Sequence, residues 1–70
     1  MWKQGKLDSC EYWVKHYDES SIFGINEGRI SKLLVRRDGR EVINFDRGWD
    51  LEPKTDEDRA ILAKILKLFN

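Results

Sequence analysis

The pair Asp38-Gly39 lies between two short apolar runs, at 33–35 and 42–43, and constrains the fold more than any other feature of the chain. A two-residue hairpin loop of type I′ needs positive φ at both central residues, and Asp followed by Gly is one of the commonest ways to supply it. The apolar runs on both sides contain Leu, Val and Ile, which suit strands. The sequence therefore predicts an antiparallel β-hairpin centred on Asp38 and Gly39.

A two-residue loop also fixes which residues face each other across the hairpin. It pairs Arg36 with Glu41 and Val35 with Val42. One face of the pair is then predicted to carry Ile30, Leu34, Ile43 and Phe45. The opposite face is predicted to carry Leu33, Val35 and Val42. Because a single helix covers only one face of a small sheet, this second apolar face is either shielded by Trp2 or Trp13 from neighbouring strands or left open to a partner.

Further strands are predicted upstream, around 2–7, over 10–17 and over 29–37, from their aromatic and β-branched content. Thr55 followed by three acids and then by apolar residues at helical spacing predicts an N-capped amphipathic helix. The fold class is therefore α+β, with a small antiparallel sheet of about three to four strands (β-β-β-β-α) packed on one C-terminal helix. Residues 1–70 form one domain, with strands within 1–47, a connecting loop at 48–54 and a helix at about 55–69.

Composition narrows the classes of function. The chain has 70 residues, 13 basic and 13 acidic side chains, and a single cysteine, Cys10. Balanced charge gives no overall field toward nucleic acid or anionic membranes, and one cysteine cannot form an intramolecular disulfide. No long apolar run predicts a membrane span or a signal peptide. We expect a reduced, cytoplasmic protein.

The sequence predicts no catalytic, cofactor or metal site. His16 is the only histidine, and six residues of strand place it about 20 Å from Cys10, too far to share an ion. No glycine pattern matches a phosphate-binding loop. We therefore expect a protein that is not an enzyme and holds no cofactor.

The segment Asp46, Arg47, Gly48, Trp49 and Asp50 is the one cluster that resembles a binding site. Its two carboxylates suit a divalent cation or a small ligand. The alternative is a structural turn, in which Gly48 supplies a positive φ, Trp49 folds over the edge of the core and Arg47 pairs with an acid. The structural interpretation is the stronger one.

Two macromolecular partners are considered. The face carrying Leu33, Val35 and Val42 favours a protein partner or a homodimer, which makes a non-enzymatic interaction module the leading hypothesis. The alternative is single-stranded nucleic acid, stacked on strand aromatics beside cations. The residues that suggest it are Tyr12, Trp13, Tyr17, Phe45, Lys15, Lys32, Arg36 and Arg37. Neutral net charge argues against it.

The run FGINEGRISKL at 23–33, followed by NFDRGWD at 44–50 and by Glu52-Pro53, resembles a family of small proteins of unknown function from Firmicutes and their mobile elements. The resemblance covers most of the chain. It implies a bacterial, cytoplasmic protein and assigns no catalytic role, cofactor or partner to any residue.

Overall fold

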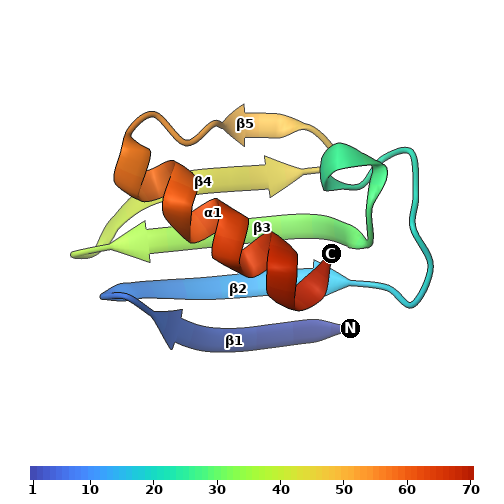
Figure 1. Ribbon diagram of the computed structural model, residues 1–70, viewed down its shortest axis with the longest axis horizontal. Helices are drawn as coiled ribbons and strands as arrows, with labels where there is room; N and C mark the ends of the chain where they lie inside the picture. Colours follow the sequence, from blue (N-terminus) through green and yellow to red (C-terminus); the bar gives the residue numbers. More distant parts are fainter.

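The computed structural model describes residues 1–70 as a five-stranded antiparallel sheet with one helix across it (Figure 1). The strands follow one another in the sheet in chain order. They are β1 (Trp2–Leu7), β2 (Cys10–His16), β3 (Ile30–Arg37), β4 (Arg40–Asp46) and β5 (Trp49–Leu51). A short 3₁₀ turn, η1 (Ile25–Glu27), precedes β3, and the helix α1 (Asp56–Phe69) follows β5. The predicted α+β class is confirmed, with one strand more than expected, because residues 49–51 of the predicted loop pair with β4.

The hairpin predicted at Asp38-Gly39 joins β3 to β4. Both residues have positive φ, +54° and +76°, as a type I′ turn requires. Residues Asp8 and Ser9, which connect β1 to β2, also have positive φ, +49° and +69°. Tight turns of this kind allow each strand to pair directly with the next one.

The predicted register of this hairpin is correct only beside the turn. Arg36 pairs with Glu41 as expected, but Val35 then pairs with Ile43, which leaves Val42 as an extra residue in β4. Such a β-bulge moves every later side chain of β4 to the opposite face relative to β3. The predicted grouping of Leu34 with Ile43 and Phe45 on one face is therefore wrong, and so is the interpretation in which the face of Leu33, Val35 and Val42 lies open.

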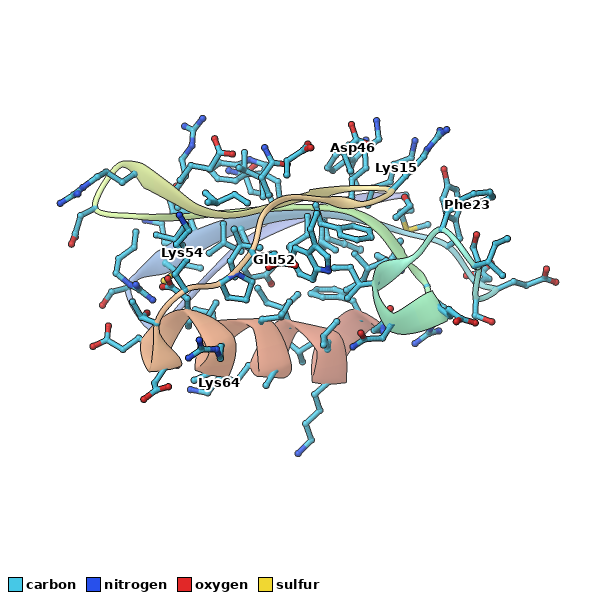
Figure 2. The ribbon with its side chains drawn as sticks, turned by 90° about the horizontal axis from the view of Figure 1, so that it is seen from above. Lys15, Phe23, Asp46, Glu52, Lys54 and Lys64 are labelled. Carbon is cyan, nitrogen blue, oxygen red and sulfur yellow. The ribbon has the colours of Figure 1, made fainter.

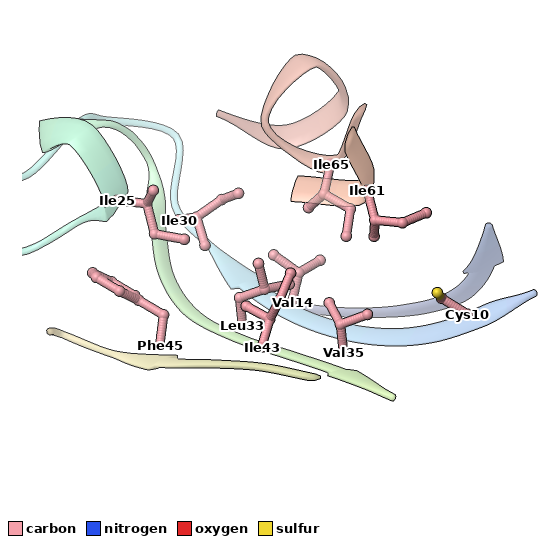
Figure 3. Close-up of a cluster of buried hydrophobic side chains, with 10 residues drawn as sticks. All are labelled: Cys10, Val14, Ile25, Ile30, Leu33, Val35, Ile43, Phe45, Ile61 and Ile65. Atoms are coloured by element: carbon pink, nitrogen blue, oxygen red, sulfur yellow. The ribbon is translucent and has the colours of Figure 1, made fainter. Parts of the chain in front are cut away.

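Those residues belong to the side of the sheet covered by the helix. Leu33 and Val35 are fully buried, and Val42 is partly buried against the same core. Leu34, which was predicted to face the helix, lies in the alternate position of β3. The core cluster is shown in Figure 3 and consists of Cys10, Val14, Ile25, Ile30, Leu33, Val35, Ile43, Phe45, Ile61 and Ile65.

The helix begins where the sequence predicts. The Thr55 hydroxyl accepts a hydrogen bond from the Asp58 backbone N–H at 3.1 Å, which caps the first turn. The Asp58 carboxylate does not complete a capping box. It is buried and accepts a hydrogen bond from Arg37 of β3 at 2.5 Å, so this ion pair ties the start of α1 to the sheet.

The other end of α1 is tied to the loop between β2 and β3 by Asn70. The side-chain oxygen of Asn70 accepts from the Ile30 N–H at 3.0 Å, and its amide nitrogen donates to the Ile25 carbonyl at 3.1 Å. A Cβ at Gly28 would collide with the same amide group, which explains a glycine at this close approach. Residues 22–25 form no strand and belong to this clamped loop.

Candidate functional site

One face of the sheet is left uncovered by the helix, and we call it the open face. Figure 2 shows Lys15 and Asp46 projecting from it, away from α1, whereas Lys64 lies on the helix. Alternation along the paired strands places three cross-strand rows of side chains on this face. The first row is Trp2, Lys15, Lys32 and Asp46; the second is Gln4, Trp13, Leu34 and Asn44; the third is Lys6, Glu11, Arg36 and Glu41.

The third row, nearest the Asp38-Gly39 turn, is electrostatically balanced. Its charges alternate across the four strands, so that each cation faces an acid on the neighbouring strand. Opposite charges directly across an antiparallel pair are favourable. This end of the open face therefore has little charge left for a ligand.

The second row is largely apolar and forms the centre of the face. Trp13 and Leu34 line a shallow hollow of ≈ 390 Å³ together with Trp2 and Arg36. The Trp2 side chain is 56% exposed, although it is one of the largest apolar groups in the chain. The Arg36 guanidinium lies 5.5 Å from the centre of the Trp13 ring, a cation-π contact. The shallow hollow is thus largely aromatic and is bordered by the Arg36 cation.

The first row carries an unbalanced positive charge. Lys15 and Lys32 are directly opposite each other on β2 and β3, an arrangement that costs stability unless an anion lies nearby. Lys32 has one weak partner, Asp46, at 3.7 Å, and both side chains of that pair are substantially exposed. The Lys15 ammonium lies 5.6 Å from the centre of the Tyr17 ring. Two cations beside exposed Trp2 are the most distinctive feature of the surface.

The Asp46 to Asp50 segment forms the tight turn between β4 and β5. Arg47, and not Gly48, takes the positive φ, at +58°. Trp49 packs edge-on against Phe45, with ring centres 5.0 Å apart, as the structural interpretation expects. Arg47 forms no ion pair within 4.0 Å, and the Asp46 carboxylate instead pairs with Lys32.

No group of three or more His, Cys, Asp or Glu side chains is arranged to hold a metal ion. Cys10 is buried in the core, and the His16 ring packs on Phe69 with centres 5.3 Å apart. The Nε2 atom of His16 is buried without a hydrogen-bond partner. Both residues therefore lie on the helix-covered side and are remote from the open face.

The aromatics expected on one sheet divide between its two sides. Trp13 and Tyr17 belong to the open side, whereas Tyr12 and Phe45 pack toward the core. Sequence reasoning did not include Trp2 and Leu34 in this surface. The alternation of Trp2 with Gln4 and Lys6 was a usable signal for Trp2, but Leu34 required knowledge of the bulge.

These features define a class of small antiparallel α+β domains in which one helix covers one sheet face and the other face carries aromatic and basic side chains. The chain belongs to the family described as Domain of unknown function (DUF7678), whose model matches residues 1–70. Comparison with curated proteins and with solved structures found no match. None of its helices has both the length and the apolar character needed to cross a membrane.

Proposed function

We propose that this protein is a non-enzymatic binding module whose open face takes single-stranded nucleic acid. The observation that carries the proposal is the placement of exposed Trp2 beside the opposed cations Lys15 and Lys32. Unpaired bases stack on aromatic rings while lysines neutralise the neighbouring phosphates, and sheets that bind single strands use this combination. A bacterial, cytoplasmic setting, expected from the resemblance and the single cysteine, belongs to the same proposal.

The distribution of charge supports nucleic acid despite a formal net charge of +0. Acids and bases cancel in the row nearest the hairpin turn, but the row containing Lys15 and Lys32 has only Asp46 to offset them. A local excess of this size engages few phosphates. We therefore expect binding of moderate affinity with a shallow salt dependence, about −0.7 in log K against log salt for each phosphate contacted on a single strand.

A protein partner or a second copy of the chain was the leading hypothesis, but its main support was the apolar face of Leu33, Val35 and Val42. That face is covered by α1, and the three rows of the open face hold one aliphatic residue, Leu34, beside two tryptophans, four cations and three acids. Aromatic and cationic content suits bases and phosphates better than an aliphatic protein surface. Self-association becomes the alternative outcome of the experiment below.

Titration with an oligothymidylate at low salt tests the proposal through tryptophan fluorescence. We expect the oligonucleotide to quench the fluorescence of the parent and not that of Trp2→Ala. In the double variant Lys15→Gln/Lys32→Gln the binding constant should fall about tenfold, and the slope of log K against log salt should become shallower by about 1.4. The matched control is Lys54→Gln/Lys67→Gln, which makes the same charge change away from the open face and should bind as the parent does.

Two results would refute nucleic-acid binding. One is unchanged fluorescence of the parent protein with oligonucleotide at low salt. The other is a dimer in light scattering that Leu34→Lys converts to a monomer, because the open face would then be occupied by a second copy. Circular dichroism of every variant establishes that the substitutions leave the fold intact.

A further inference from the structure

A separate pocket lies beyond the first row of the open face, where the loop between β2 and β3 meets the turn between β4 and β5. Its volume is ≈ 280 Å³. The residues that line it are Tyr17, Ser21, Phe23, Gly24, Arg29, Ser31 and Arg47. Figure 2 shows Phe23, one of its walls, at the same end of the sheet as Lys15 and Asp46. No carboxylate side chain lines the pocket. We call it the basic pocket.

Two arginines, Arg29 and Arg47, line the basic pocket, and neither forms an ion pair with a carboxylate side chain. Arg29 donates only from Nε, to the backbone oxygen of Asn70 at 3.4 Å, which leaves its terminal nitrogens unpaired. The Arg47 backbone is fixed by its N–H bond to the Ser31 carbonyl at 3.0 Å. Four cations of the chain form ion pairs, and Arg29 and Arg47 are not among them, so both remain available to an external anion.

Hydroxyl groups complete the lining. The Ser21 oxygen accepts from the Phe23 N–H at 3.1 Å, which leaves the hydroxyl proton free to donate. The Tyr17 hydroxyl has a pKa below its ordinary value, first because of hydrogen bonding with Lys15, with Ser31 and Arg47 adding to the effect while burial opposes it. A lowered phenol pKa indicates a positive local potential. Cations and hydroxyl donors therefore share this pocket.

We propose that the basic pocket binds a phosphate monoester. A monoester carries a charge of about −1.5 to −2 and three strong acceptor oxygens, which suits two guanidinium forks and a hydroxyl donor better than a singly charged diester does. The volume lies at the small end of ligand sites, which suits one phosphoryl group. Its place beside Lys15 and Lys32 makes the terminal phosphate of a bound strand the favoured source, and that part rests on the proposed function.

Amide and arginine side-chain NMR signals provide the test with inorganic phosphate as the probe, at constant ionic strength with chloride as the reference. We expect saturable shifts at Ser21, Gly24 and Arg47 in the parent protein. Arg29→Gln and Arg47→Gln should each weaken phosphate binding about tenfold, the factor that corresponds to one charged hydrogen bond. Arg40→Gln, an equal charge change at the opposite hairpin end, should leave it unchanged.

Arg47→Lys keeps the charge but loses the planar fork, so we expect an intermediate loss. Absence of saturable shifts with phosphate, or equal weakening by Arg40→Gln, would overturn the proposal. A 5′-phosphorylated oligothymidylate that binds more tightly than its 5′-hydroxyl form supports a strand end as the source. Phosphate binding without that preference supports a free phosphate ester, and the fluorescence titration of the open face then decides the proposed function separately.

Discussion

Replacing Asn70 by Ala tests how the loop that carries the basic pocket is held. The substitution removes the acceptor of the Ile30 N–H and the donor to the Ile25 carbonyl, and both of those residues are at most 1% exposed. A buried backbone group left without a partner costs about 1 to 3 kcal/mol. Water can enter part of the vacated space, because Asn70 is only half-buried. The Ile25 carbonyl keeps its hydrogen bond from the Gly28 N–H, so only the Ile30 N–H is left without a partner, and we expect a loss of about 1 to 3 kcal/mol.

Such a loss is large for a chain of 70 residues, whose total stability is about 4 to 10 kcal/mol. It corresponds to a fall in Tm of about 4 to 24 °C for a domain of this size. Urea unfolding at neutral pH measures the free energy, and amide hydrogen exchange at Ile30 measures the local effect. Exchange at Ile30 should accelerate, because its N–H loses its hydrogen-bond partner.

Two further variants separate this clamp from general damage. Asn70→Asp keeps an acceptor for Ile30 and loses the donor to Ile25, so its loss of stability should be smaller than that of Asn70→Ala. Asn44→Ala removes an exposed bond between side chains, from Asn44 to Glu41, and should cost less than about 1 kcal/mol. If the free energy of unfolding of Asn70→Ala lies within about 0.5 kcal/mol of that of the parent, the reasoning about the buried Ile30 N–H is wrong.

The remaining predictions concern acid stability and the hairpin turn. Burial alone would raise the Asp58 pKa, but hydrogen bonds from Arg37 and Thr55 outweigh burial and lower it. The contribution of Asp58 to the free energy of unfolding is therefore present above the ordinary carboxyl pKa of about 3.9 and is lost as the pH falls further. Asp58→Asn should lower Tm at pH 7 more than Asp56→Asn, a substitution at an exposed acid. In thermal scans from pH 7 to pH 2, the difference in Tm between the parent and Asp58→Asn should shrink. A constant difference would contradict the link between the lowered Asp58 pKa and stability. Gly39→Ala meets no steric contact but keeps a φ of +76°, so it should cost about 1 to 2 kcal/mol in urea unfolding. Gly48→Ala, which has open space and no positive φ, should cost nothing; equal losses would show that the left-handed backbone is not the cause.

Local chemistry made several elements predictable. The positive φ needed at Asp38 and Gly39 located the hairpin, and Thr55 with the following acids located the start of α1. These signals act within a few residues, so the sequence is sufficient to read them. The strand β5 was missed because its three residues pair with β4 only after a turn whose positive φ falls on Arg47, where a glycine was the expected residue.

The side chains of the open face could not be predicted from the sequence, because their identity depends on a single extra residue, Val42. Both sides of the β3–β4 hairpin are apolar enough to be core, so alternation alone does not decide which side the helix covers. The bulge at Val42 decides it, because it brings Ile43 and Phe45 to the same side as Leu33 and Val35. That combined surface is larger than either face of an unbulged hairpin, and Ile61 and Ile65 of α1 pack on it.

The same bulge determines which side chains the open face presents. By placing the aliphatic residues of two strands on the helix side, it leaves Leu34 on the open side with Trp2 and Trp13, and with Lys15 and Lys32 in the adjacent row. The open face is therefore not the aliphatic patch that would favour a protein partner, and its aromatic and basic side chains are the ones on which the proposed nucleic-acid binding rests. In this fold the inference of function depends on the strand register, and the residue that sets the register, Val42, packs on the helix-covered side of the sheet.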